Sequence, residues 1–194
     1  MVPTSLTQER PSTLAFGARR SVPEQLAGAY TAGWTVLLAV AGTCALVPAA
    51  RWVAQHELAL ALHVHIHPAP APTIAAFAWL LVNNVHATGW PLLPVLLHAQ
   101  RHRVLRRVVH AAVAVSVSVN LLPVAAAIGV YRAAIVPYLP HLPLELYAIT
   151  TGPATWALAC RRTLTSRQLA AIALSMLLAL AGAALLETCS VPHR

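Results

Sequence analysis

The stretch 138-YLPHLPLELYAITT-151 opens an apolar segment that continues to Cys160 and encloses one histidine and one glutamate. Pro143 is a favourable first helical residue, so Glu145 is expected in the first turn, where the helix dipole favours negative charge. His141 lies four residues before Glu145. A carboxylate in an apolar segment costs free energy unless neighbouring helices shelter it, so this stretch predicts a packed helical bundle.

The composition of the whole chain is that of a membrane protein. Apolar residues make up 58% of the 194 positions and charged residues only 9%, far from the proportions of a soluble domain. The formal net charge is +8, but the arginines lie in short clusters between apolar segments, a pattern that faces the cytoplasm and anionic lipid rather than nucleic acid. We therefore predict an all-α, multi-pass protein of the cell membrane, with the lipid bilayer as a partner and no nucleic acid.

Five segments are long enough to cross a bilayer, whose apolar core of about 30 Å needs roughly 20 helical residues. Pro91 and Pro94 predict an irregularity in the second segment, and Pro153 predicts one in the fourth. The predicted spans are Tyr30–Ala50, Thr73–Ala99, Val108–Val130, Pro143–Cys160 and Gln168–Thr188.

The placement of arginine predicts the orientation of these spans. Ten arginines flank them on one side and three on the other. The positive-inside rule therefore places the N-terminus inside and the C-terminus outside. The inner set is Arg10, Arg19, Arg20, Arg101, Arg103, Arg106, Arg107, Arg161, Arg162 and Arg167; the outer set is Arg51, Arg132 and Arg194.

Two segments outside the spans have predictions of their own. Residues 1–29 are polar and lack periodicity, so we expect a disordered cytoplasmic tail before a single transmembrane domain at 30–192. Residues 51–72 form the main outer connection. Its sequence 52-WVAQHELALALHVHIH-67 has apolar residues at helical spacing and predicts a short amphipathic helix on the membrane surface.

The histidines of this connection are weak candidates for a metal site. His63, His65 and His67 alternate, so an extended chain would project all three to one side, and three imidazoles suit zinc, copper or nickel. In a helix, only His63 and His67 would share a face. The simpler interpretation is a set of solvated or headgroup-facing histidines, so no metal and no other cofactor is predicted.

A set of polar residues falls near the middle of the predicted spans. Such side chains are costly against lipid, so we expect them to face one another inside the bundle. Two interpretations stay open: hydrogen bonds that hold the bundle together, or a polar path for a proton or small solute. The set comprises Asn83, Asn84 and His86, with Trp79 and Trp90 on the same stripe as Asn83 and His86, then Ser116, Ser118 and Asn120, and finally Thr150 and Thr151.

A second glutamate, Glu187, ends the fifth predicted span on the same outer side as Glu145. Ala179, Ala183 and Glu187 follow small-xxx-small spacing, which lets helices approach closely. We therefore predict two carboxylates at similar depth near the outer boundary, on a packed pair of helices. They could serve as acid and base, but no nucleophile motif and no H-E-x-x-H motif accompanies them, so an intramembrane enzyme is the least favoured reading.

Three stretches of the chain resemble the stage II sporulation protein M family of bacterial and archaeal membrane proteins. The segment 77-FAWLLVNNVHATG-89 is similar to the family's Asn-containing second span, 140-PHLPLELYA-148 to its Pro-His and Leu-Glu-Leu motif, and 183-AALLETCSVP-192 to its closing Glu and Pro. The likeness extends over most of residues 30–192. Leu142 stands where the family usually has glycine.

The resemblance implies a membrane protein with no established catalytic residues. In spore formers the family member recruits and holds peptidoglycan-remodelling partners at the septal and engulfing membrane. We therefore expect a scaffold for cell-envelope proteins, with self-association as a further option, and no enzyme; a transporter or permease-like subunit is the alternative. The resemblance places Asn83, Asn84, Pro140, His141, Glu145 and Glu187 in the shared core, and the transport alternative adds His86 and Asn120 as path-lining residues.

Overall fold

A computed structural model describes residues 21–65 and 73–190, and within these ranges every regular element is helical, as predicted. The long helices are α1 (Val22–Leu46), α2 (Pro48–His65), α3 (Ile74–Gly89), α5 (Arg103–Tyr131), α6 (Leu142–Ala159) and α7 (Ser166–Ser190). Shorter helical pieces are α4 (Leu92–Leu96), η1 (Ala99–Arg101) and η2 (Arg132–Tyr138).

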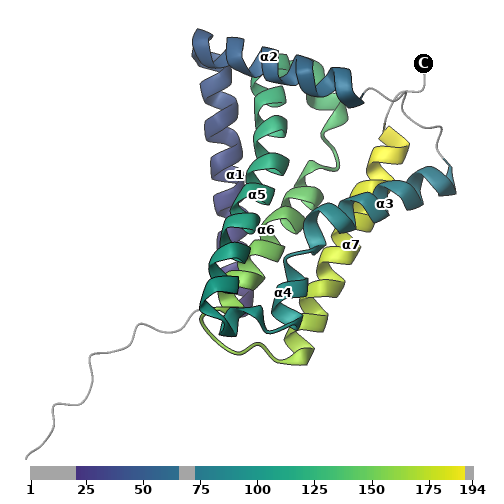
Figure 1. Cartoon of the computed structure of the whole chain (residues 1–194). Coiled ribbons are helices and arrows are strands. Elements are labelled where there is room, and N and C mark those ends of the chain that lie inside the picture. The colour runs from purple at the N-terminus through teal and green to yellow at the C-terminus, as the bar shows by residue number, and fades with distance from the viewer. Residues whose placement is uncertain (1–20, 66–72, 191–194) are drawn as a thin grey trace, which may run out of the picture.

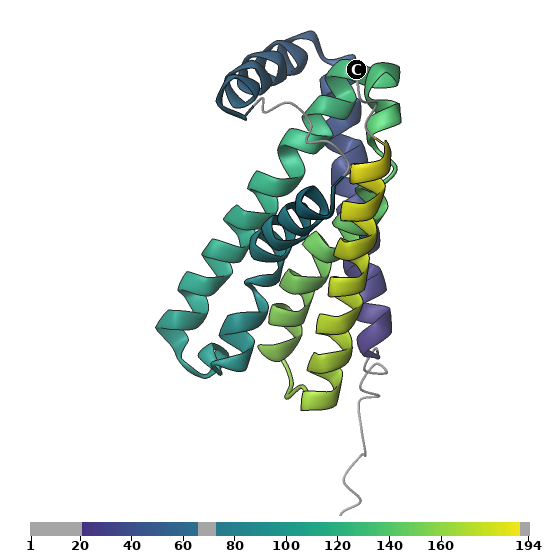
Figure 2. The ribbon, with the colours of Figure 1, turned by 90° about the vertical axis from the view of Figure 1, so that its right-hand side faces the viewer.

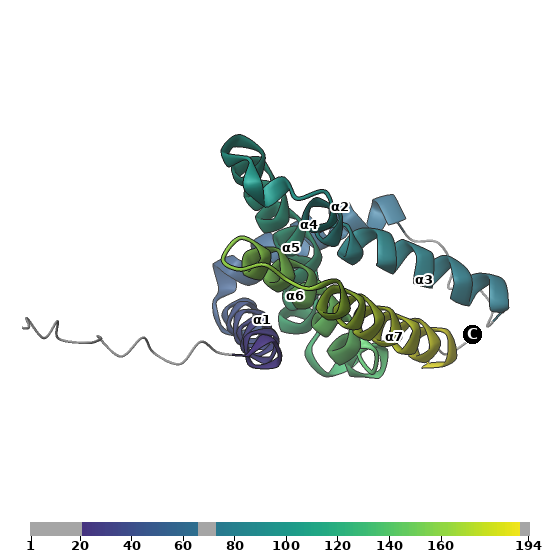
Figure 3. The same ribbon diagram turned by 90° about the horizontal axis from the view of Figure 1, so that it is seen from below.

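Helix α6 is the centre of the bundle. It packs against α1, α5 and α7, while α2 lies across the ends of α1 and α5 (Figure 1). Viewed from below, α6 lies among α1, α5 and α7 (Figure 3). Ten of its eighteen residues are buried, so it has no continuous exposed face.

The buried hydroxyl groups of α6 mostly bond to their own helix. Thr150 Oγ1 donates to the Leu146 carbonyl at 2.8 Å, and Thr155 Oγ1 donates to the Thr151 carbonyl at 2.8 Å. A hydroxyl that is bonded in this way avoids most of the cost of burying an unsatisfied polar group. The central helix can therefore enclose Thr150 and Thr155 at little cost, whereas the buried Thr151 hydroxyl has no hydrogen-bond partner.

Three of the helices, α1, α5 and α7, are long and apolar enough to cross a membrane. The predicted second span is not one continuous helix. Helix α3 ends at Gly89 and α4 begins at Leu92, because the proline between them has no N–H to continue the helical hydrogen bonds. The irregularity predicted from Pro91 is confirmed, and α3 runs obliquely beside α7 (Figure 2).

The first helix begins earlier than predicted. Helix α1 begins at Val22, so the predicted tail boundary at residue 29 is wrong. The reason is a capping box: the Ser21 hydroxyl accepts from the Glu24 N–H, and the Glu24 carboxylate accepts from the Ser21 N–H at 2.6 Å. These bonds satisfy two N–H groups at the helix start. Residues 1–20 lie outside the described part of the chain.

The helix predicted in the outer connection is present as α2, which follows α1 almost directly. The Arg51 guanidinium of α2 and the Arg132 guanidinium of η2 both donate to the Ala45 carbonyl near the end of α1. Trp52 lies over His56 on α2, with 4.0 Å between ring centroids. Arginine side chains thus fasten α2 and η2 to the end of α1.

Helices α1 and α5 are in close backbone contact at Gly129. A Cβ atom added there would lie 2.4 Å from the Ala41 carbonyl oxygen and 2.7 Å from Cys44 Cβ. The first of these atoms belongs to helix backbone and cannot rotate aside. Gly42, by contrast, has no atom within 4 Å of an added Cβ.

We predict that Gly129→Ala destabilises the bundle, because α1 and α5 must move apart. Overpacking of this kind costs about 1–3 kcal/mol. Thermal unfolding of the purified protein in detergent should show a clearly lower midpoint. Gly42→Ala is the matched control and should keep or raise the midpoint, because alanine favours a helix interior over glycine by roughly 1 kcal/mol. Equal midpoints for the two variants would contradict the close α1–α5 contact.

Candidate functional site

The candidate site lies where α6 begins and α7 ends. His141 immediately precedes α6, Glu145 is in its first turn, and Glu187 is in the last turn of α7. One nitrogen or oxygen atom from each of these three side chains lies within 4.8 Å of the other two. The predicted proximity of the two glutamates on a packed helix pair is confirmed.

The site is recessed in the bundle. Helix α6 begins below the level at which α1 and α5 meet α2 (Figure 1). The side chains of His141 and Glu145 expose 18% and 20% of their surface to solvent. Pro140, just before them, is exposed. The two side chains are thus reachable from outside the protein but largely surrounded by it.

Each carboxylate oxygen of Glu145 has a different neighbour. Asn84 Nδ2, from α3, donates to Glu145 Oε1 at 3.0 Å. His141 Nε2 lies 3.7 Å from Glu145 Oε2. Residues four apart on a helix lie one above the other, which explains the second contact. The carboxylate is therefore held between a side chain of its own helix and one from α3.

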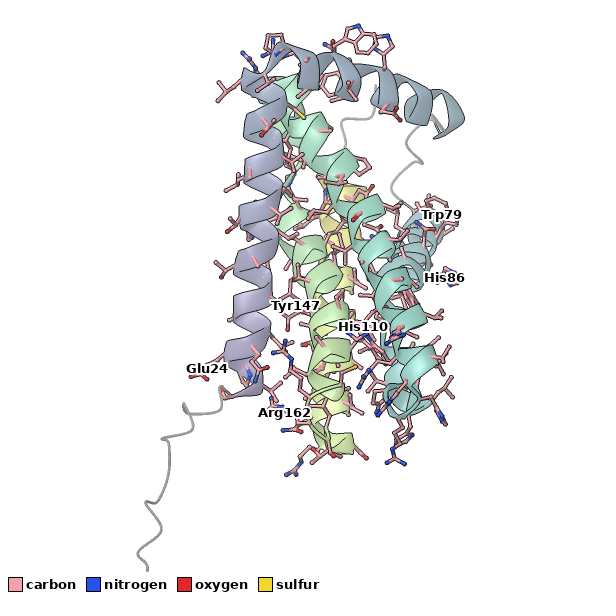
Figure 4. The ribbon with its side chains drawn as sticks, turned by 60° about the vertical axis from the view of Figure 1, so that its left-hand side comes forward. Glu24, Trp79, His86, His110, Tyr147 and Arg162 are labelled. Atoms are coloured by element: carbon pink, nitrogen blue, oxygen red, sulfur yellow. The ribbon has the colours of Figure 1, made fainter. Side chains whose placement is uncertain are left out.

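Asn84, and not Asn83, is the amide that faces the bundle. Asn83 and His86 are exposed, whereas Asn84 is half-buried and Thr88 is buried. Figure 4 shows His86, like Trp79, on the outer side of α3. The prediction that the stripe of Asn83 and His86 points inward is therefore wrong.

The physical reason is the contact between α3 and α6 at Gly152. A Cβ added to Gly152 would lie 2.9 Å from the Thr88 carbonyl oxygen, so α3 rests against α6 at this point. Since Asn84 lies one helical turn before Thr88, it is turned toward α6 as well. The rotation of α3 follows from a contact between helices, and its own sequence gives little sign of it.

The polar residues predicted on α5 divide into two groups, those that face the bundle (Ser116 and Asn120) and one that is exposed (Ser118). Ser116 receives a hydrogen bond from Trp90 Nε1 at 3.0 Å, and its carbonyl accepts from Asn120 Nδ2 at 2.7 Å. Ser118 is exposed and donates to a carbonyl of its own helix. A cavity of about 140 Å³ is lined in part by Asn84, Asn120 and Glu145. The structure thus brings these three side chains around one space and leaves Asn83 and His86 outside it.

The histidines of the outer connection are not arranged as an extended strand. His63 and His65 belong to α2, so the alternation required for that arrangement is lost where the chain is helical. His67 lies outside the described residues, as do the side chains of residues 58–72. The metal hypothesis for this tract stays a prediction.

Sequence reasoning missed a second polar contact between α6 and α7. The Tyr147 hydroxyl lies 3.0 Å from Ser175 Oγ. Both residues line an open hollow of about 750 Å³ together with Tyr30 and Arg162; Figure 4 shows Tyr147 and Arg162 along α6 and the loop that follows it. A tyrosine hydroxyl inside a bundle needs a hydrogen-bond partner. The tyrosines within the predicted spans were therefore the sequence signal that could have indicated this contact.

Comparisons of the chain with protein-family models, with curated proteins and with solved structures find no match. The resemblance to the stage II sporulation protein M family rests on three stretches of sequence. In the structure each of them contributes to the site: the first provides Asn84, the second His141 and Glu145, and the third Glu187.

We predict that Asn84→Ala lowers the free energy of unfolding by about 1–2 kcal/mol, because Glu145 loses a hydrogen-bond donor in a largely buried setting. Asn83→Ala is the matched control, since that side chain is exposed. It should change the unfolding midpoint little. Unfolding of both variants in detergent, followed by circular dichroism, measures the difference. A larger loss for Asn83→Ala would contradict the orientation of α3.

Proposed function

We propose that this chain is an integral membrane scaffold, similar in role to the stage II sporulation protein M family, that holds cell-envelope partners at the membrane. The observation that carries the proposal is the meeting of the three family-like stretches at one site. Asn84, Glu145 and Glu187 come from α3, α6 and α7, which are far apart in sequence. The three family-like stretches converge at this site, and the motifs in them include no catalytic nucleophile. A structural core shared with the family would account for this convergence.

Hydrogen bonds between partly buried polar side chains support a bundle whose helices are tied to one another. Hydrogen bonds between side chains join α3 to α6 through Asn84 and Glu145, and α6 to α7 through Tyr147 and Ser175. Trp90, which follows α3, bonds to Ser116 of α5. Polar contacts of this kind hold helices together in an apolar solvent. They suit a protein that presents a fixed surface to its partners.

We further propose five membrane crossings, with α3 and α4 together forming the second. The starts of α1, α5 and α7 and the end of α6 gather at one end of the bundle (Figure 2). The segments at that end carry seven of the arginines in the described ranges, which favours the cytoplasmic side for it. Helix α2 then lies on the outer surface, where it exposes Trp52 and Val53. An amphipathic helix suits the boundary between lipid and water.

We predict that alkaline phosphatase fused after Arg194 is active in intact bacterial cells, since the enzyme needs the oxidising exterior. Green fluorescent protein fused at the same position should stay dark when exported through the general secretory route. A fusion at the loop that carries Arg161 and Arg162 should show the reverse pattern. Active phosphatase at that loop would overturn the proposed orientation.

A transporter is the second candidate function, and the cavity beside Glu145 is the observation that favours it. The cavity reaches polar groups of three helices and is lined by a carboxylate, which proton-coupled carriers use. Its volume of about 140 Å³ has room for a few waters and not for a large solute. This candidate therefore concerns a proton or a small ion.

We predict that Glu145→Gln keeps partner binding while the fold survives, because the amide can still accept from Asn84. The chain, tagged and cross-linked in its native membrane, should co-purify peptidoglycan-cleaving activity detectable in a gel that contains peptidoglycan. The unchanged protein and Glu145→Gln should give equal recovery, and Glu57→Gln serves as the exposed control. A proton flux in liposomes that Glu145→Gln abolishes, with no envelope activity recovered, would instead establish the transport candidate.

A further inference from the structure

Three side chains able to bind a metal converge at the start of α6. His141 offers a ring nitrogen, and Glu145 and Glu187 offer carboxylate oxygens, all within 4.8 Å of one another. Two carboxylates at this separation repel each other when both are ionised, and a cation bound between them would offset that repulsion. Among the side chains that the structure describes, the one acid–base pair within salt-bridge distance is His141 with Glu145, and it engages one carboxylate.

Two arginine side chains of the same half of the bundle have partners away from this site. Arg51 and Arg132 lie near the end of α1, and both guanidinium groups donate to the Ala45 carbonyl. Glu145 instead accepts from the neutral amide of Asn84. The site therefore combines two acids and one imidazole. Its side chains include a positive charge only when the imidazole is protonated.

We propose that His141, Glu145 and Glu187 bind one divalent transition-metal ion, of which zinc and manganese are the fitting examples. The ion would fasten the start of α6 to the end of α7. A donor set of one imidazole and two carboxylates suits these metals, whereas magnesium and calcium prefer oxygen ligands alone. This inference goes beyond the scaffold role and does not depend on it, and it departs from the sequence-based expectation that no metal is bound.

The distances fit such a site after small rotations of the side chains. Zinc bonds of about 2.0–2.2 Å place two ligand atoms of a tetrahedral site about 3.4 Å apart. His141 Nε2 and Glu145 Oε2 lie 3.7 Å apart, one helical turn from each other on the same helix. Glu187 approaches from α7 and supplies the third ligand. Two elements that are separate in sequence would thus share one ion.

The surroundings of Glu145 match those of a metal ligand. Asn84 Nδ2 holds Glu145 Oε1, which leaves Oε2 directed toward His141. Metal-binding carboxylates are commonly oriented by an outer hydrogen bond of this kind. A cavity of about 140 Å³ adjoins the site on the side of Asn84, and Glu145 is the one proposed ligand that lines it. The partial exposure of His141 and Glu145 gives an ion a way in.

The test uses the full chain, purified in detergent and stripped with EDTA. The histidines of the outer connection are removed in every protein by His63→Ala, His65→Ala and His67→Ala, so that they cannot contribute binding. Isothermal titration with zinc chloride, and separately with manganese chloride, should show one ion per chain. Glu187→Gln and Glu145→Gln should weaken binding at least tenfold, whereas the exposed control Glu57→Gln should leave it unchanged.

A second measurement tests the proposal even when a ligand variant fails to fold, because it uses the protein with all three ligands intact. Cobalt(II) added to the protein with all three ligands intact should produce visible absorption bands of a four- or five-coordinate ion, and zinc should displace them. The zinc-loaded protein should also unfold at a higher temperature than the stripped one. The absence of cobalt bands, or zinc affinity that Glu187→Gln leaves unchanged in a folded protein, would overturn the proposal. Recovery of envelope partners by stripped protein would leave the scaffold role intact.

Discussion

Enclosure of α6 by other helices is the constraint on which the bundle depends. The buried polar groups of an enclosed helix need partners within the protein, and Thr150 and Thr155 find them in carbonyls one turn earlier. Neighbours must also come close to it. Gly33 of α1 and Gly152 of α6 provide the room. A Cβ added to Gly33 would lie 2.5 Å from Thr150 Cγ2, and one added to Gly152 would lie 2.9 Å from the Thr88 carbonyl oxygen.

The candidate site follows from the same enclosure. Glu145 occupies the first turn of a covered helix, so other helices must surround its carboxylate. Helix α3 provides an amide donor to Glu145, and α7 brings Glu187 alongside. An acidic group is thereby kept away from lipid and coupled to three helices at once. The site therefore lies at a junction of α3, α6 and α7, a position that the proposed scaffold role and the proposed ion site share.

The two ends of the bundle have different chemistry. One end gathers arginines from the starts of α5 and α7 and the loop after α6 (Figure 2). The other end carries α2, whose Trp52 and Val53 are exposed, and beneath it the recessed acids. Exposed apolar residues on α1, α5 and α7 complete a surface suited to lipid.

The sequence by itself determined the helical class, the apolar helices, the amphipathic helix after α1 and the break at Pro91, because periodicity, hydropathy and proline stereochemistry are local properties. The closeness of Glu145 and Glu187 also followed, from antiparallel neighbours and the small residues Ala179 and Ala183. The tertiary structure alone decided that Asn84 and not Asn83 reaches Glu145. Adjacent residues on a helix differ by about 100° in direction. Only the contact of α3 with Gly152, more than sixty residues away in sequence, fixes which of them points inward.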